Sequence, residues 1–266
     1  MAGLEAHYSA RDIEARILAA IRAAGLSPEN RLLPEDLGAL DHFHTGGIRA
    51  TRELLELAKI RAEDRVLDIG AGLAGPARLL TSAVGCHVDC LELSTDFCAG
   101  AVLLNRLTGQ DDRIEVHKGS ALDIPFPDDS FDVVWMQNVG MNIADKRGLY
   151  AEIYRVLKPG GRYAFQEMAA GKVGTSYFPL PWASDPADSF LVSAEETCSI
   201  LGESGFIAVL FEDTSDTHLD ATAAAAAPSP LTLDVYVDNL AQKAGNARRS
   251  LQMGQIRLVR GVFRVK

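Results

Sequence analysis

Three glycines at fixed intervals are the residues whose spacing first indicates chemistry. Gly70, Gly72 and Gly75 follow the strand-like run 65–69 and precede an apolar pattern of helical spacing. A strand that passes into a helix through a glycine loop is typical of ligand binding, because glycine allows the backbone to approach a ligand closely. The spacing G-x-G-x-x-G also occurs in dinucleotide-binding proteins, so NAD or FAD is the first ligand class to consider.

Asp68 argues against a dinucleotide. It stands at the end of the predicted strand, where its carboxylate would repel a pyrophosphate. A cofactor without phosphate and with a net positive charge on its amino-acid end would accept this carboxylate. S-adenosylmethionine is such a cofactor, since it carries a sulfonium and an ammonium. The run D-x-G-x-G after a strand resembles motif I of the class I S-adenosylmethionine-dependent methyltransferases.

Glu92 is the second candidate for cofactor binding. It ends the apolar-biased run 86–91 and lies 20 residues beyond Gly72. An acid at the end of the neighbouring strand can accept hydrogen bonds from both ribose hydroxyls of an adenosine. We expect Leu93, next along the chain, to belong to the same site.

The run G-S-A-L-D-I-P-F at 119–126 resembles the segment that lies against the adenine in this family. The resemblance therefore assigns Ser120, Ala121 and Leu122 to the cofactor site. Ser120 stands where the family most often has Asp, and a serine hydroxyl accepts a hydrogen bond from the adenine amine more weakly than a carboxylate does.

Two later runs match the family in the same order. The run 127–136 matches motif II, and Gln137, Asn138 and Asn142 follow at the carboxyl end of its strand, where ligands of open α/β sheets bind. We expect Gln137 to contact the cofactor and the two asparagines to contact the acceptor, although Asn also commonly bonds loop backbone. R-V-L-K-P-G-G at 155–161 matches motif III, a turn that returns the chain to the sheet.

A segment upstream of the glycine loop carries two histidines around an aromatic ring. His42, Phe43 and His44 precede two glycines in a predicted helical cap, so we expect them to line the acceptor pocket, with His42 or His44 as the catalytic base. The alternative is a structural role for each histidine. No metal is expected, because Asp41 and the two histidines offer too few well-directed ligands.

The long loop 171–188 is the other predicted part of the acceptor site. It contains Tyr177 and Trp182, and so long a loop is usually functional. Aromatic rings after the fifth strand can cover a small substrate, so we expect both residues to bind the acceptor. Packing within the cap is the alternative.

The resemblance, which covers residues 60–213, also implies the architecture. It implies an α/β fold: a Rossmann-like seven-stranded, mostly parallel sheet with the last strand antiparallel, helices on both faces and a helical cap. We divide the chain into an N-terminal helical cap (1–60), the S-adenosylmethionine-binding core (61–213), and an inserted cap helix with the final antiparallel strand (214–266).

Hydrophobic periodicity predicts the elements outside the core. Apolar residues at helical spacing predict a helix at 12–24 that Gly25 ends. A second helix is expected at 232–253 and a closing strand at 256–265. The Ala-rich run 222–230 ends in Pro-Ser-Pro and predicts a surface link.

Composition excludes several classes of partner. The chain of 266 residues carries a net charge of −10, which disfavours nucleic acid and anionic membranes. It shows no signal-peptide pattern and no apolar run of membrane-spanning length, so we expect a cytoplasmic protein with no membrane partner. The four cysteines form no C-x-x-C pair and are expected to be reduced thiols. The oligomeric state is left open.

Three further segments refine the resemblance. D-x-F-H-x-G-G, Q-N-V-x-M-N-I-A-D-K and the C-terminal R-L-V-x-G-V-F are similar to the sarcosine/dimethylglycine N-methyltransferase-like group, whose wider membership also acts on natural products. The resemblance implies transfer of a methyl group from S-adenosylmethionine to N, O or C of a small molecule by in-line displacement. A nicotinamide-dependent oxidoreductase, which Asp68 and motif III oppose, and a non-catalytic S-adenosylmethionine-binding protein remain as alternatives.

Overall fold

The computed structural model describes residues 11–38, 40–221 and 230–266. The chain forms two compact units. The first comprises Met1–Pro125 and Ala226–Asp238, and the second comprises Phe126–Ala225 and Asn239–Lys266. These boundaries differ from the predicted division at residues 60 and 213, which stays a prediction.

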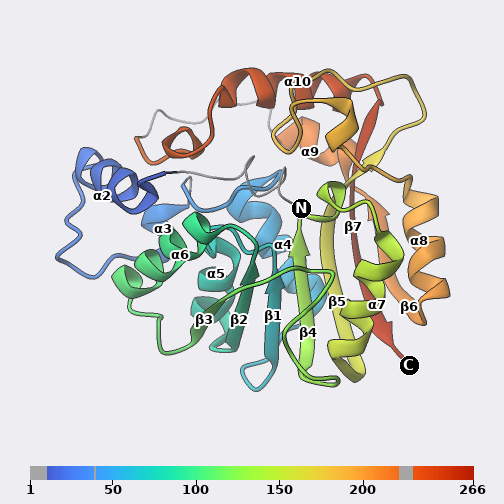
Figure 1. Cartoon of the computed structure of the whole chain (residues 1–266), viewed down its shortest axis with the longest axis horizontal. Helices are drawn as coiled ribbons and strands as arrows, with labels where there is room; N and C mark the ends of the chain where they lie inside the picture. Colours follow the sequence, from blue (N-terminus) through green and yellow to red (C-terminus); the bar gives the residue numbers. More distant parts are fainter. Residues whose placement is uncertain (1–10, 39, 222–229) are drawn as a thin grey trace. The chain divides into compact units, whose positions relative to one another are not determined.

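The first unit is built on parallel strands joined by helices (Figure 1). β1 (Arg65–Ile69) pairs with β2 (His87–Glu92), and β2 pairs with β3 (Ile114–Lys118), so the carboxyl ends of these strands share one edge. α5 (Gly75–Val84) and α6 (Thr95–Thr108) connect the strands. The other described elements of this unit are α2 (Ile13–Ala23), α3 (Pro34–Leu37), α4 (Gly47–Ala58) and the 3-10 turn η3 (Leu233–Val235).

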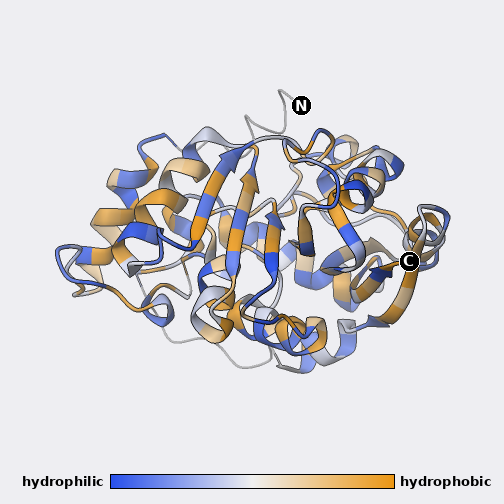
Figure 2. Ribbon diagram, turned by 90° about the horizontal axis from the view of Figure 1, so that it is seen from below, coloured by the Kyte–Doolittle hydropathy of each residue, from blue (hydrophilic) through white to orange (hydrophobic). Residues whose placement is uncertain are grey.

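Local sequence signals explain where these helices begin and end. The hydroxyl of Ser94 accepts a hydrogen bond from the Phe97 amide at 3.3 Å and so caps α6, which ends at Gly109 with φ of 62°. Pro76 lies in the first turn of α5, where its missing N–H costs nothing. In Figure 2 the strands carry hydrophobic segments interrupted by hydrophilic ones. All residues of β1 and β2 except the first of each are nevertheless buried.

The second unit combines a parallel and an antiparallel pairing. β4 (Phe131–Gln137) runs parallel to β5 (Leu157–Ala170), whereas β7 (Ile256–Val265) runs antiparallel to both β5 and β6 (Phe206–Asp213). The other described elements are the 3-10 turns η1 (Gly140–Asn142) and η2 (Pro186–Asp188) and the helices α7 (Lys146–Val156), α8 (Ala194–Glu203), α9 (Ser215–Ala221) and α10 (Leu240–Gln252).

The predicted fold class is confirmed. The seven strands have the order β3-β2-β1-β4-β5-β7-β6, and the last strand of the chain, β7, is the antiparallel one. The motif III glycine Gly160 has φ of 76° and lies in the first part of β5, where the pairing with β4 is irregular. Within the described ranges, no helix is both long enough and apolar enough to span a membrane.

The helix predicted at 232–253 is wrong in its first part. The chain forms the turn η3 and then starts α10 only after Asn239, which adopts a left-handed φ of 55° that asparagine tolerates. The apolar residues Tyr236 and Val237 belong instead to the first unit, where both are buried. The predicted surface link at 222–230 lies outside the described residues, except for Pro230.

An aromatic cluster fills the core of the second unit. Phe165 is fully buried, and its ring centroid lies 4.8 Å from that of Tyr163, 5.9 Å from Phe263 and 6.2 Å from Phe211. Gly261 pairs with Phe165 across β5 and β7, and a Cβ on Gly261 would lie 2.9 Å from the rings of Phe165 and Phe263. A side chain at position 261 of β7 would collide with these rings, so glycine is required there.

Replacement of Phe165 tests the weight of this cluster. Phe165→Ala is expected to lower the free energy of unfolding by about 3–5 kcal/mol, because it leaves a cavity among rings that cannot collapse into it. Val209→Ala on exposed β6 is the control and should change it by less than about 0.5 kcal/mol. Guanidinium unfolding followed by circular dichroism measures both. Equal losses would contradict this account of the core.

Candidate functional site

The glycine loop leaves β1 at the carboxyl edge of the first unit. Gly70 and Gly72 have φ of 66° and 55°, values that favour glycine. The amides of Gly70 and Ala71 both donate to the carbonyl of Leu91, at 2.8 Å and 3.3 Å, so the loop stays attached to the end of β2. The predicted strand, loop and helix are therefore present, with the loop beside Glu92.

Gly75 has a role that the motif alone did not indicate. A Cβ at this position would overlap the carbonyl oxygen of Asp41. The third glycine of the motif thus allows the backbone of Asp41, and with it the histidine segment, to pass directly over the start of α5.

Glu92 fastens the loop with both carboxylate oxygens. Its Oε2 accepts the amide of Gly72 at 2.9 Å, and its Oε1 accepts the amide of Ser94 at 2.8 Å. Burial raises the pKa of Glu92, although these backbone donors oppose the shift. Each carboxylate oxygen has a second lone pair, so the group can still accept hydrogen bonds from a ligand.

Asp68 is a buried carboxyl group without an ion-pair partner among the described residues. It is 2% exposed, and its Oδ2 has no hydrogen-bond partner in the described part of the chain. Burial and, to a smaller extent, the charge of Glu92 raise the pKa of Asp68 to about 8. A cationic ligand group would stabilise the Asp68 carboxylate, whereas a phosphate would add to the repulsion between Asp68 and Glu92.

The loop after β3 lies beside the end of β2. The amide of Gly119 donates to the carbonyl of Glu92 at 3.0 Å, and the amide of Leu122 donates to the hydroxyl of Ser120 at 3.1 Å. Leu93 and the predicted adenine segment, Ser120, Ala121 and Leu122, therefore follow the ends of adjacent strands. The Gly119 bond places the start of this loop beside Glu92, and the contact of these residues with a cofactor stays a prediction.

The two histidines have different surroundings. Nδ1 of His42 lies 2.7 Å from Oδ1 of Asp41, and its Nε2 is buried with no partner among the described residues. His44 has both nitrogens engaged, with Thr51 Oγ1 at 3.0 Å and the Thr45 carbonyl at 3.4 Å. Burial and, secondarily, the charge of His42 lower the pKa of His44 to about 3. His44 is therefore a weak base.

Arg78 is a site residue that the sequence did not reveal. It is fully buried on α5 and donates to Asp41 Oδ2 at 2.8 Å, to Asn105 Oδ1 at 2.6 Å and to the carbonyl of Leu73. Burial alone would raise the pKa of Asp41, but the charge of Arg78 and the contacts with His42 more than offset it, so this pKa is lowered. An arginine within an apolar helical stretch gave no signal of a partner so far away in the chain.

Phe43 packs on a segment from the far end of the chain. Its ring lies 6.0 Å from that of Tyr236 in an edge arrangement, and Tyr236 also meets Phe97 at 5.3 Å. The hydroxyl of Tyr236 donates to the carbonyl of Leu40 at 2.8 Å. The segment around His42 is thus fixed by two different parts of the first unit.

In the second unit, a buried acid organises the loop after β4. Glu167, another residue that the sequence analysis missed, accepts the amides of Val139 at 2.6 Å and Met141 at 3.0 Å. Burial raises the pKa of Glu167 to about 7. Lys146 donates to the carbonyls of Gly140, Ile143 and Phe190, so the loop that carries Asn138 and Asn142 is rigidly held.

Two of the three predicted polar residues at the end of β4, Gln137 and Asn138, bond to neighbouring side chains. Gln137 is buried and its Oε1 accepts the Trp135 indole N–H at 3.0 Å. Asn138 has a left-handed φ of 54°, and its Oδ1 accepts a hydrogen bond from Gln166 Nε2 at 3.2 Å. Asn142 is half-buried in η1. Gln137 is the last residue of β4 and the two asparagines follow it, so all three lie at its carboxyl end. Their ligand contacts stay predictions.

The two aromatic candidates of the long loop, Tyr177 and Trp182, differ in burial. Trp182 is 3% exposed and belongs to a second hydrophobic cluster, which includes Met141 and Leu251. Its indole N–H donates to Ser189 Oγ at 2.9 Å. Tyr177 is half-buried, and the guanidinium of Arg249 lies 3.9 Å from its ring centroid. Tyr177 is the more accessible of the two, and both acceptor roles stay predictions.

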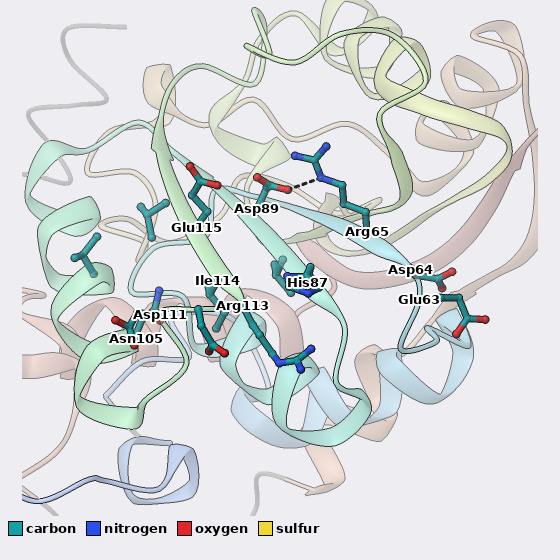
Figure 3. Close-up of a pocket in the computed structure, with 14 residues that line it drawn as sticks. Glu63, Asp64, Arg65, His87, Asp89, Asn105, Asp111, Arg113, Ile114 and Glu115 are labelled. Atoms are coloured by element: carbon teal, nitrogen blue, oxygen red, sulfur yellow. Dashed lines mark hydrogen bonds and ion pairs between the residues drawn. The ribbon is translucent and has the colours of Figure 1, made fainter.

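A pocket of about 640 Å³ lies at the amino ends of β1, β2 and β3 (Figure 3). Arg65 pairs with Asp89 there at 2.9 Å. Asp89, Glu115 and His117 each offer one potential metal-binding atom, and these three atoms lie within 4.8 Å of one another. Both oxygens of Asp89 already contact Arg65 or His117. Ligands of parallel α/β sheets bind at the opposite, carboxyl ends, so this pocket is not the candidate site.

Comparison with known proteins finds a family match within the chain. Residues 67–165 match the family described as a methyltransferase domain. The chain is 38% identical over 126 residues to a glycine/sarcosine/dimethylglycine N-methyltransferase of Actinopolyspora halophila, in a match covering 47% of this chain and 22% of that protein. The chain thus spans well under half the length of this relative.

Two solved structures share the fold. A putative sarcosine dimethylglycine methyltransferase from Galdieria sulphuraria has a TM-score of 0.64 at 22% identity, covering 82% of this chain and 85% of that one. Geranyl diphosphate C-methyltransferase from Streptomyces coelicolor A3(2), solved with S-adenosyl-L-homocysteine, has a TM-score of 0.66 at 18% identity, covering 82% and 79%. The resemblance carried by the motifs is confirmed: residues 67–165 are similar to the family described as a methyltransferase domain.

Proposed function

We propose that this protein transfers a methyl group from S-adenosylmethionine to a small-molecule acceptor. The observation that carries the proposal is the buried, unpaired carboxyl group of Asp68 beside the Gly70–Gly72 loop and Glu92. A cationic amino-acid group would supply the charge partner that Asp68 lacks. The residues present therefore fit S-adenosylmethionine and do not fit a pyrophosphate.

Each predicted cofactor contact has a chemical reason in this chain. Asp68 would take the positive end of the cofactor, and Glu92 would accept the ribose hydroxyls while it fastens Gly72. Ser120, Ala121 and Leu122 would lie against the adenine, and Gln137 is the predicted further contact. The cofactor supplies an activated methyl group on a sulfonium. The protein then has to align the acceptor, exclude water and remove a proton where the nucleophile carries one.

The relatives support a small acceptor of this kind. One acts on glycine, sarcosine and dimethylglycine by its name, and a structural neighbour on geranyl diphosphate. We propose that Phe43, Asn138, Asn142, Tyr177 and Trp182 are the residues to test for acceptor binding. The net charge of −10 favours neither nucleic acid nor an anionic membrane as partner, and we expect a cytoplasmic location.

The alternatives make different predictions. None of the three proteins described above is named as a nicotinamide-dependent enzyme, so that alternative gains no support. A non-catalytic sensor would bind S-adenosylmethionine but transfer no methyl group. Transfer of tritium from methyl-labelled S-adenosylmethionine to an added amine or phenol distinguishes an enzyme from a sensor.

The first test is calorimetric titration with S-adenosylmethionine, S-adenosylhomocysteine and NAD. We expect the first two to bind and NAD not to bind. Glu92→Gln should weaken their binding at least tenfold, because hydrogen bonds to a charged acceptor contribute about 1.5–3 kcal/mol each. Glu115→Gln, at an exposed position on β3, is the matched control and should leave the affinity within twofold. Binding of NAD alone would overturn the proposal.

Asp68 gives a second, acid-base test. At pH 7 a carboxyl group with a pKa of about 8 is mostly protonated, and a bound cation would lower that pKa. Binding of S-adenosylmethionine should therefore release about one proton, and the affinity should rise several-fold from pH 6 to pH 7.5. Calorimetry in buffers of different ionisation enthalpy measures the release. Asp68→Asn should abolish it, whereas exposed Asp112→Asn should not.

The same substitution should stabilise the unliganded protein. Asp68 has a pKa of about 3.9 when unfolded and about 8 when folded, so the folded state binds more protons between these values. This group therefore makes stability fall as pH rises from about 4 to 8. Asp68→Asn should raise the melting temperature at pH 8 while it weakens cofactor binding. A lower melting temperature would show that the Asp68 carboxylate is paired.

A further inference from the structure

His42 is held in one protonation pattern by Asp41. A carboxylate only accepts hydrogen bonds, so the contact of 2.7 Å places the proton of the neutral ring on Nδ1. Nε2 is then the unprotonated nitrogen. It is buried and has no hydrogen-bond partner among the described residues, which is unusual for a buried polar atom.

Asp41 is held in turn by Arg78. Asp41 and Arg78 are 3% and 0% exposed, and Arg78 is itself fixed by Asn105 and the carbonyl of Leu73. A buried ion pair is seldom more stabilising than apolar side chains of similar volume. A use for the pair beyond stability is therefore indicated, and fixing the charge of Asp41 beside His42 is what its geometry achieves.

The position of this group relative to the cofactor loop is fixed as well. The Asp41 backbone passes so close to Gly75 that a Cβ there would overlap it. On the other side, Tyr236 bonds the carbonyl of Leu40 and packs on Phe43. His42 cannot move away from the glycine loop without disturbing both contacts.

His44 does not have the same properties. Its nitrogens already contact Thr51 and Thr45, and no acid in the described part of the chain is hydrogen-bonded to its ring. The two rings lie 5.5 Å apart edge to face, so His44 packs against His42.

We infer that His42 is the catalytic base, that Nε2 is the atom that takes the proton, and that Asp41 and Arg78 are its positioning residues. This inference rests on the proposed function and narrows the acceptor to a molecule whose nucleophilic nitrogen or oxygen carries a proton. The lone pair of that atom forms the bond to the methyl carbon, and the carbon–sulfur bonding pair stays with sulfur, which becomes a neutral thioether. The proton of the nucleophile passes to Nε2, and Asp41 stabilises the imidazolium.

Nitrogen-15 NMR of the histidine rings in the full chain tests the arrangement directly, with S-adenosylhomocysteine as the added probe. His42→Gln identifies the His42 signals. At pH 7.5 we expect a protonated Nδ1 and an unprotonated Nε2 in the wild type, and a mixture of both tautomers in Asp41→Asn. Exposed His87→Gln is the control and should leave the His42 signals unchanged. A protonated Nε2 in the wild type would overturn the inference, whatever happens to the folding of Asp41→Asn.

Methyl transfer tests the acceptor class with a secondary and a tertiary amine, sarcosine and dimethylglycine. We expect transfer to sarcosine to exceed transfer to dimethylglycine, and His42→Gln to reduce it at least a hundredfold with S-adenosylhomocysteine affinity within twofold of wild type. Transfer to dimethylglycine that His42→Gln leaves within twofold would overturn the inference. If neither amine is methylated, the NMR result decides. If the wild type does not bind S-adenosylhomocysteine, the proposed function itself is rejected.

Discussion

The parallel pairing of β1 with β2 is the interaction on which the candidate site depends. It sets Asp68 opposite Cys90, so that the glycine loop and Glu92 emerge at one edge. In this register the Gly72 amide donates to Glu92 Oε2. A slip of one strand by one residue would place Asp68 and Glu92 on opposite faces of the sheet. The hydrophobic burial that fixes the register therefore also keeps the two acids on one face.

The first unit deals with its buried acids in two ways. Asp41 stays charged, because Arg78 and His42 compensate the cost of burial and lower its pKa. Asp68 has no such partner, and its pKa rises to about 8. A buried carboxyl group that the fold leaves unpaired lowers stability, and a ligand of positive charge explains why it is there. Stability and ligand binding thus make opposite demands on Asp68.

The parts that the sequence could predict are those encoded by near neighbours. Asp68, Gly70 and Glu92 were predictable because strand ends and glycine turns are local patterns. Arg78 was not, because its partner Asp41 lies 37 residues earlier in the chain. The helix predicted at 232–253 failed for the same reason: its first apolar residues pack on the first unit, where Tyr236 bonds a carbonyl 196 residues away.

Gly75 shows why the glycine spacing alone was ambiguous. In dinucleotide-binding folds the third glycine of G-x-G-x-x-G serves close packing of helix on strand. Here a Cβ at Gly75 would meet Asp41, so the glycine is required by the approach of the segment that carries His42. The third glycine of the same motif therefore answers two different steric requirements: close packing of helix on strand in dinucleotide-binding folds, and the close approach of Asp41 here. Which demand applies depends on the chain segment that crosses the loop, and Asp41 is joined by Arg78 to the very helix that Gly75 begins.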